Sequence, residues 1–134
     1  METSCGVVLV NFGSVLLLQY PQGHWGFPKG HYEAEDGAYQ QTALRELEEE
    51  TGYSATSFQS LGQVTPLAGF CDEIQHLFVA KDLSLTTRFE CDEDEVIEVI
   101  ELSLEELQDK IRHDQITDTK TIACLSKALL CGYL

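Results

Sequence analysis

The segment of residues 38–51 constrains the fold of this chain more than any other. Most of its residues are Ala, Gln, Leu, Glu and Arg, which are strong helix formers, and it contains neither proline nor glycine. Asp36 stands where it can cap the first turn, and Gly52 stands where a glycine commonly ends a helix. The sequence therefore predicts one long helix, with apolar segments before and after it forming the rest of the fold.

Those apolar segments have the length and composition of β-strands. Residues 4–10 and 15–18 are predicted to pair as a hairpin around a turn at 11–14. Strands before and after a central helix, followed by helices that close the chain, indicate a mixed α/β fold, and 134 residues suit a single domain, 1–134. The remaining predictions are an extended piece at 25–27, loops at 28–37 and 81–94, strands at 58–64, 73–79 and 95–102, a helix from a capping box at 103–106 to about residue 112, and a helix from Thr117 or Asp118 to Cys131.

The chain is strongly acidic, with 23 Asp and Glu residues against 8 Lys and Arg and a formal net charge of −15. So few cations cannot cover a run of phosphates or an anionic membrane surface, which argues against binding to nucleic acids and to membranes. The apolar runs are strand-sized, no secretory signal is visible, and five cysteines do not make a disulfide framework. We therefore expect a cytoplasmic protein in which a divalent metal would bring in any anionic substrate.

Three glutamates of the predicted helix fall on one face. At 100° per residue, Glu50 lies about 40° from Glu46, and Glu49 lies about 60° away on the other side. Glu48 is expected to point the opposite way, into solvent, and Arg45 is placed four residues before Glu49, where the two can pair. A shared cation relieves the repulsion among three carboxylates, and hard oxygen atoms suit Mg²⁺ or Mn²⁺. A solvated acidic face is the alternative interpretation of the helix alone.

The loop before the helix favours the metal site over the solvated face. Residues 27–31 are Phe-Pro-Lys-Gly-His, which places a glycine between a lysine and a histidine just ahead of the acidic helix. Together these segments resemble the signature of the Nudix hydrolases: Gly, five residues, Glu, seven residues, then Arg-Glu-apolar-x-Glu-Glu-x-Gly-apolar. Residues 45–53 fit the second half at every specified position, and Gly30 fits the start.

The match departs from the signature at one point. The loop between Gly30 and Arg45 is one residue longer than the pattern, so strict counting back from Arg45 puts Gly37 at the middle acid. An inserted residue leaves Glu35 or Asp36 to fill that role. In the family this acid usually supports the structure rather than binding metal.

The resemblance implies an α/β/α sandwich with a mixed sheet, in which the signature forms a loop-helix-loop motif, and cleavage of a nucleoside diphosphate linked to another group. Arg45 would orient the glutamates. The general base would be a glutamate of the helix or a carboxylate of the acidic run at 92–95, where Glu95 fits best and Glu93 second. The implied catalytic residues are Arg45, Glu46, Glu49 and Glu95, and the implied ligands of Mg²⁺, or alternatively Mn²⁺, are the carbonyl of Gly30 and the side chains of Glu46, Glu49 and Glu50.

Two groups within the family match different parts of the chain. Residues 23–31 resemble the asymmetric diadenosine tetraphosphate hydrolases, in which the lysine and histidine of this loop lie close to the phosphate chain. Residues 65–73, 92–99 and 118–122 resemble the ADP-ribose pyrophosphatases. The resemblance thus implies that Lys29 and His31 bind the phosphates. Tyr32 is a further candidate, for stacking on adenine, and Glu73 is a candidate either to contact a ribose or only to end a strand.

Hydrolysis of diadenosine tetraphosphate to ATP and AMP is the leading hypothesis, because the loop that touches the phosphates matches that group. Hydrolysis of ADP-ribose to AMP and ribose 5-phosphate is the first alternative, and a house-cleaning enzyme that hydrolyses nucleoside triphosphates is the second. A Nudix-fold module that binds a nucleotide without cleaving it is the alternative outside the enzymes. The predicted partner is a small nucleotide, and the two groups leave the assembly open between a monomer and a homodimer.

Overall fold

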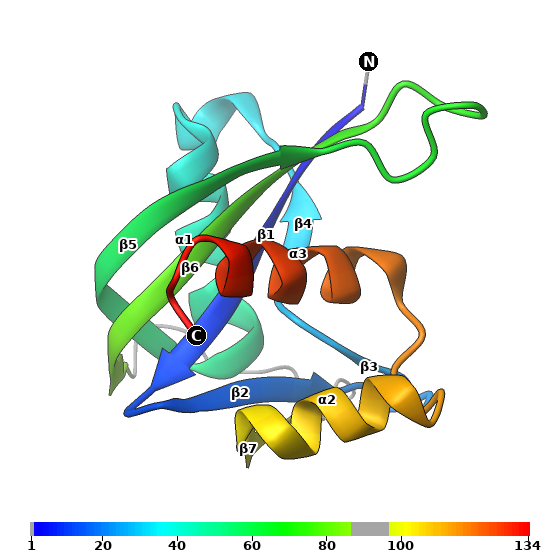
Figure 1. Cartoon of the computed structure of the whole chain (residues 1–134). Helices are drawn as coiled ribbons and strands as arrows, with labels where there is room; N and C mark the ends of the chain where they lie inside the picture. The colour runs from blue at the N-terminus through cyan, green and yellow to red at the C-terminus, as the bar shows by residue number, and fades with distance from the viewer. Residues whose placement is uncertain (1, 87–96) are drawn as a thin grey trace.

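A computed structural model describes residues 2–86 and 97–134 of the chain (Figure 1). None of the helices in this described part has the length and apolar composition needed to cross a membrane. In chain order the elements are β1 (Thr3–Asn11), β2 (Ser14–Gln19), β3 (Trp25–Gly26), β4 (Lys29–His31), the short 3₁₀-helix η1 (Ala34–Asp36), α1 (Tyr39–Thr51), β5 (Tyr53–Val64), β6 (Ile74–Leu85), β7 (Glu98–Leu102), α2 (Leu104–Arg112) and α3 (Thr119–Leu130).

The described strands form one mixed sheet. Its path runs β3-β2-β1-β6-β5, while β4 pairs with β1 and β7 pairs with β2. β1 and β6 run parallel, and the other pairs are antiparallel. The β1–β2 hairpin closes at Phe12 and Gly13, whose positive φ angles of 48° and 85° belong to the tight turn that matches the twist of a hairpin.

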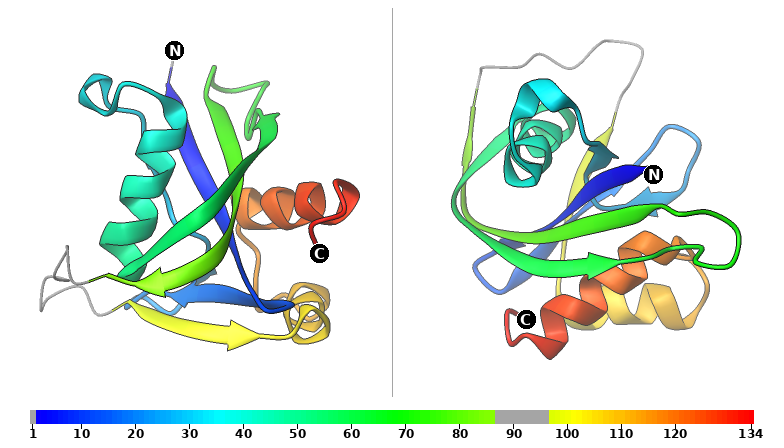
Figure 2. Two further views of the ribbon diagram at one scale, coloured as in Figure 1. Left: turned by 90° about the vertical axis from the view of Figure 1, so that its left-hand side faces the viewer. Right: turned by 90° about the horizontal axis from the view of Figure 1, so that it is seen from above.

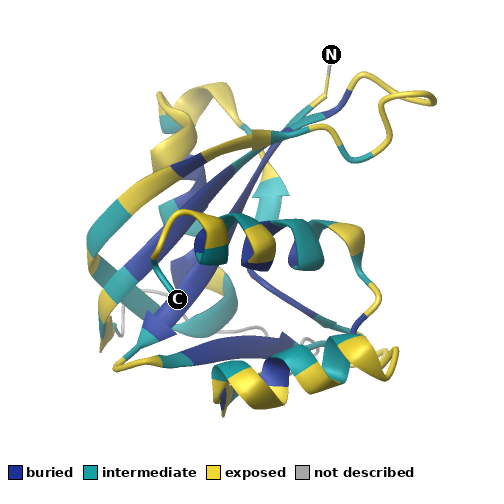
Figure 3. Ribbon diagram, viewed as in Figure 1, coloured by how far each residue is buried: buried dark blue, intermediate teal, exposed yellow. Residues whose placement is uncertain are grey.

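Helices cover both faces of this sheet, as the left view in Figure 2 shows. Side chains alternate along β1, so Val7 packs in the cluster under α1 while Val8 packs in the cluster under α2 and α3. Leu47 of α1 and Leu107 of α2 are fully buried in these two clusters, and the buried stretches lie along the central strands (Figure 3). The predicted α/β/α arrangement with a mixed sheet is confirmed.

Most predicted elements are confirmed, and two predicted loops are wrong in part. The loop predicted at 28–37 contains β4 and η1, and the loop predicted from residue 81 begins later, because β6 continues to Leu85. β5 begins directly after Gly52 and pairs Tyr53 with Leu85, which gives the backbone of this polar stretch its hydrogen bonds. The strand predicted at 95–102 is described from Glu98 onward, as β7.

The predicted cap of α1 is also wrong. Ala38 occupies the N-cap position, and Asp36 ends η1 two residues earlier. The Asp36 carboxylate accepts hydrogen bonds from the side chains of Thr42 and Arg45 instead, further along the helix. The other end of the helix is as predicted, because Gly52 has the left-handed conformation that ends it.

Replacing Ser103 with Ala should lower the free energy of unfolding by about 1 kcal/mol, because it removes the capping box of α2. The hydroxyl of Ser103 accepts the main-chain N–H of Glu106 at 3.1 Å, and the Glu106 carboxylate accepts the N–H of Ser103 at 3.3 Å. Urea unfolding followed by circular dichroism measures the loss. Ser126→Ala is the matched control, since its exposed hydroxyl bonds the Ile122 carbonyl within α3. An equal loss in both variants would contradict the capping role.

Candidate functional site

Gly30 and Glu46 meet where β4 passes α1. Gly30 pairs with Cys5 of β1, whose side chain belongs to the cluster under α1. A Cβ atom on Gly30 would lie 2.2 Å from the carboxyl carbon of Glu46, far inside van der Waals contact. The absence of a side chain at Gly30 therefore lets the main chain of the loop lie directly against this carboxylate, which brings together two of the predicted metal ligands.

Glu46 and Glu50 lie one turn apart on the buried part of the helix face. Burial raises the pKa of Glu46, and burial together with the charge of Glu46 raises the pKa of Glu50 to about 8. The Tyr20 hydroxyl donates to Glu50 at 3.4 Å, and the main-chain N–H of Lys29 also donates to this carboxylate. Two half-buried carboxylates that resist ionising side by side gain free energy from a shared cation.

Arg45 holds the outer part of the same face. Its Nη1 donates to Glu46 at 3.0 Å and to Glu49 at 3.3 Å, so the predicted pairing with Glu49 is present. Its Nε donates to Asp36 at 3.1 Å, and the Thr42 hydroxyl donates to the same carboxylate at 2.8 Å. Of the two acids that the sequence offers for this position, Asp36 is thus the one that hydrogen-bonds Arg45 and fixes its guanidinium against the glutamates, while Glu33 lies 3.8 Å from the same guanidinium.

The oxygen ligands that this site offers suit a hard divalent cation that keeps part of its hydration shell. Within residues 2–86 and 97–134, no group of three or more Asp, Glu, His or Cys side chains is gathered closely enough to hold a metal ion by itself. Arg45 supplies the positive charge between Glu46 and Glu49, whose side chains are 15% and 41% exposed. Mg²⁺ is commonly held by one or two carboxylates plus waters and substrate phosphates, so a partial set of oxygen ligands beside Gly30 suits it.

Glu48 does not point into solvent as predicted, because it is only 7% exposed. On the helical wheel it lies about 40° from Leu44, which packs against the cluster under α1. The chain also turns back at Gly52 into β5, so the last turns of the helix are covered on that side. The helical wheel alone does not show this second covered side.

Two predicted substrate residues lie on the side of the sheet covered by α3. The ammonium group of Lys29 is 3.7 Å from Asp118, the residue that caps α3. Glu73 is almost fully buried and accepts hydrogen bonds from Lys120 at 2.5 Å and from Ser4 at 3.0 Å. Hydrogen bonds from Lys120 and Ser4 lower the pKa of the Glu73 carboxyl against the opposing effect of its burial. The Thr121 hydrogen bond, followed by the charge of Lys29, does the same for Asp118.

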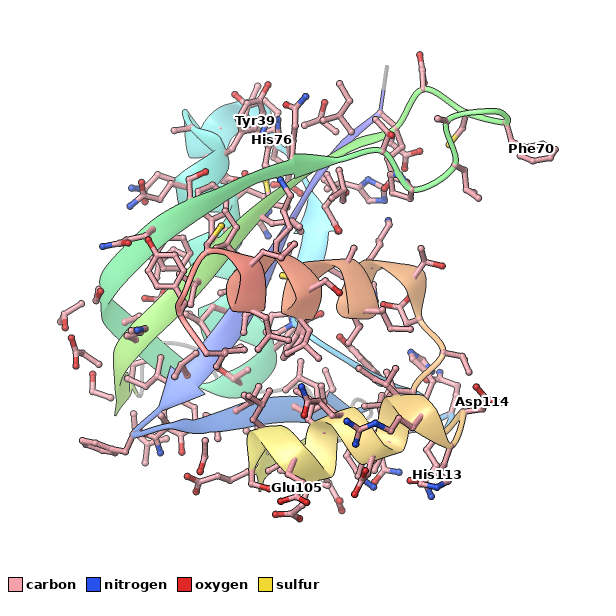
Figure 4. All side chains as sticks on the ribbon, in the orientation of Figure 1. Tyr39, Phe70, His76, Glu105, His113 and Asp114 are labelled. Atoms are coloured by element: carbon pink, nitrogen blue, oxygen red, sulfur yellow. The ribbon has the colours of Figure 1, made fainter. Side chains whose placement is uncertain are left out.

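The other predicted substrate residues lie near the surface. The exposed His31 ring is 3.2 Å from the carboxylate of Glu2. Tyr32 meets Tyr39 edge to face with ring centres 4.8 Å apart, and Tyr39 stacks on His76 at 3.9 Å (Figure 4). Tyr32 therefore already has an aromatic neighbour. The predicted bases Glu95 and Glu93 lie outside the described residues.

A family model described as the NUDIX domain matches residues 2–120, most of the chain. The chain belongs to the NUDIX domain family. Among curated NUDIX relatives, the ADP-ribose pyrophosphatase of Bacillus subtilis (strain 168) is 46% identical over 81 residues, which are 60% of this chain and 44% of that protein. The asymmetrical bis(5'-nucleosyl)-tetraphosphatase of Sus scrofa is 44% identical over 64 residues, 46% of this chain and 39% of that protein.

The matched part of this NUDIX chain thus spans less than half the length of these curated relatives. A solved structure described as an ADP compounds hydrolase superposes with a TM-score of 0.83 at 19% identity, covering 99% of this chain and 76% of that one. At that identity the likeness shows a shared NUDIX fold.

Two residues that contact predicted site residues are not singled out by the sequence. Tyr20 reaches Glu50 from just after β2, outside the family signature, and no pattern marks it. Lys120 falls in the run that resembles the ADP-ribose pyrophosphatases, but its pairing with Glu73 bridges 47 positions of sequence. The resemblance is the one signal that could have pointed to Lys120.

Replacing Asp36 with Ala should lower the stability of the NUDIX domain at neutral pH, because the Arg45 guanidinium and the Thr42 hydroxyl hold the pKa of the Asp36 carboxyl below its usual range. For a lowered pKa this stability is present above the unfolded value of about 3.9 and is lost as pH falls through the folded value. The difference between wild type and D36A should hold from pH 7 to about pH 4 and shrink below it.

Urea midpoints at several pH values measure this difference. Glu35→Ala is the control, since Glu35 neighbours Asp36 in η1 and is exposed. A D36A difference that stays constant to pH 2.5, or an equal loss in E35A, would contradict the assignment of the Arg45 partner.

Proposed function

We propose that this NUDIX domain hydrolyses the pyrophosphate linkage of a nucleoside diphosphate derivative with the help of Mg²⁺. The observation that carries the proposal is the close approach of Gly30 to Glu46, which lies on a helix face that also presents Glu49 and Glu50. A solvated acidic face has no need for a glycine packed against one carboxylate, nor for Arg45 fixed by Asp36. The family membership supports the same chemistry.

In this proposal, some residues of the chain bind the metal and another accepts a proton. Glu46, Glu50 and the Gly30 carbonyl would hold the metal, with Glu49 at the exposed edge, and Mn²⁺ is the alternative ion. When bound, the metal supplies neutralisation of the pyrophosphate charge and a lower pKa for water. A carboxylate accepts the proton of the water that attacks phosphorus as the bridging P–O bond breaks. Glu49 is the described candidate for this base, and Glu95 remains the candidate outside the described residues.

ADP-ribose is the substrate that we now place first. The B. subtilis relative named as an ADP-ribose pyrophosphatase aligns over more of this chain than the tetraphosphatase relative does. The position of Lys29 also favours ADP-ribose, because the tetraphosphate hypothesis places this lysine close to the phosphate chain. Its ammonium group is instead paired with Asp118 on the α3 side and is not directed at the glutamate face. The expected products are AMP and ribose 5-phosphate.

Diadenosine tetraphosphate is the second candidate. The observation that favours it is the position of Lys29 and His31 in the chain, directly before and after Gly30, which lies against Glu46. The expected products are ATP and AMP. In either case we expect a small nucleotide as the partner and a cytoplasmic location, with the monomer or homodimer question left to measurement in solution.

Parallel incubation with ADP-ribose and diadenosine tetraphosphate in Mg²⁺, followed by chromatography of the products, tests the proposal. We expect AMP and ribose 5-phosphate at the higher rate. Glu49→Gln should reduce turnover by about a hundredfold with little loss of stability, since an oxygen ligand is lost while the core is kept. Glu105→Gln, an exposed glutamate of α2, is the control (Figure 4). Faster cleavage of the tetraphosphate would favour the second candidate substrate. Wild-type activity in E49Q would overturn the assignment of the α1 glutamates to the active site.

Gly30→Ala should abolish most activity while the domain stays folded. Its Cβ would have to displace the Glu46 carboxylate by more than an ångström, and misplacement on that scale costs about a hundredfold in rate. Gly69→Ala is the control, because a Cβ there meets no described atom within 4 Å. Initial rates and melting temperatures of both variants in Mg²⁺ are the measurements. Equal rates for G30A and wild type would show that the contact between Gly30 and the Glu46 carboxylate has no role in the mechanism.

A further inference from the structure

Tyr20 reaches the glutamate face of α1 from outside the helix and its preceding loop. It follows directly after β2 and is half-buried, and its hydroxyl donates to Oε2 of Glu50 at 3.4 Å. The main-chain N–H of Lys29, the first residue of β4, donates to the same carboxylate. Glu50 is therefore tied to two segments of the sheet as well as to its own helix.

The hairpin between β2 and β3 fixes the main chain of Tyr20. The N–H of Tyr20 donates to the carbonyl of His24 at 3.0 Å, and the N–H of Gly23 donates to the carbonyl of Tyr20 at 2.8 Å. Gly23 has a φ angle of 98°, which glycine adopts without strain. The place of Tyr20 is thus set by local hydrogen bonds that do not involve Glu50.

Neighbouring groups fix the ring of Tyr20 as well. The His24 ring stacks on it, with ring centres 4.6 Å apart and planes 11° from parallel. The ammonium group of Lys29 lies over the ring, 5.8 Å from its centre. The ring edge lies beside Gly26, where a Cβ atom would be 3.4 Å from Cε2 of Tyr20. A ring held by these contacts presents its hydroxyl to Glu50 at a fixed position.

The donors to Glu50 differ in charge from the donor to the other two glutamates. The guanidinium of Arg45 binds the carboxylates of Glu46 and Glu49. Within residues 2–86 and 97–134, Glu50 forms no ion pair, and the Tyr20 hydroxyl and the Lys29 N–H hold it instead. Neutral donors orient a carboxylate without cancelling its charge, so the charge of Glu50 stays available to a divalent cation.

We propose that Tyr20 is a positioning residue that orients Glu50 as a ligand of the divalent metal. Hydrogen-bond partners of metal-binding side chains hold them in their binding orientation, and loss of such a partner lowers metal affinity by about tenfold to a hundredfold. The inference rests on the proposed function, because it assumes that a metal binds at the α1 glutamates. It extends the candidate site to the β2–β3 hairpin.

Binding of Mn²⁺ without nucleotide tests the proposal, measured as the loss of the free Mn²⁺ signal in electron paramagnetic resonance. Tyr20→Phe keeps the ring stacked on His24 and removes only the hydroxyl. The dissociation constant for Mn²⁺ should rise by about tenfold to a hundredfold. The melting temperature without metal should change by no more than about 5 °C, because a single neutral hydrogen bond is lost.

Tyr133→Phe is the matched control. The Tyr133 hydroxyl donates to Gln59 of β5, and its ring packs against the cluster under α2 and α3, on the sheet face opposite α1. This variant should bind Mn²⁺ as tightly as the wild type. Hydrolysis assays give a second readout: Y20F should need about tenfold to a hundredfold more Mg²⁺ for half-maximal rate, with turnover at saturating Mg²⁺ close to that of the wild type.

Equal Mn²⁺ affinity in Y20F and wild type would overturn the proposal, and so would a wild type that binds no Mn²⁺ or an equal loss in Y133F. If Y20F does not fold, His24→Ala decides, because it removes the exposed ring that stacks on Tyr20 and keeps the hydroxyl. H24A should bind Mn²⁺ about tenfold more weakly, and wild-type affinity would overturn the proposal. Weaker Mn²⁺ binding in Y20F, with a wild type that hydrolyses neither candidate substrate, would overturn the proposed function alone.

Discussion

Electrostatic repulsion among Glu46, Glu49 and Glu50 is the constraint on which the rest of this structure depends. Packing holds the helix in place against that repulsion, because Leu47 lies fully buried on the neighbouring side of α1. Arg45 lowers the repulsion by lying between two of the glutamates, and it keeps that position because Asp36 binds it from the loop. The loop, the helix and the core are therefore parts of one electrostatic arrangement.

β4 connects this arrangement to the other face of the sheet. Successive residues of a strand point to opposite faces, so Gly30 lies against Glu46 while the side chain of Lys29 lines a pocket with Gln75. A single three-residue strand thus gives its glycine to the glutamate face and its lysine to the face under α3.

The features that the sequence predicts correctly depend on residues close together in the chain. The β1–β2 hairpin, the α2 capping box and the glycine that ends α1 each rest on contacts within a few positions. The features it misses depend on distant segments. Glu48 is covered where the chain turns back into β5, and Lys120 meets Glu73 only when α3 packs beside β1. The helical wheel and the strand pattern carry no information about either.

The net charge of −15 repels any anionic substrate, and the cationic side chains near the candidate site do little to offset this repulsion because they are paired. Arg45, Lys29 and Lys120 each lie against a carboxylate of the chain itself. These ion pairs within the protein therefore largely neutralise the positive charge before a nucleotide binds. In the proposed function, the glutamates would hold a divalent metal that attracts the phosphates, and such a metal would interact with any pyrophosphate in the same way. Discrimination among nucleotides would then have to come from neutral hydrogen bonds and from shape.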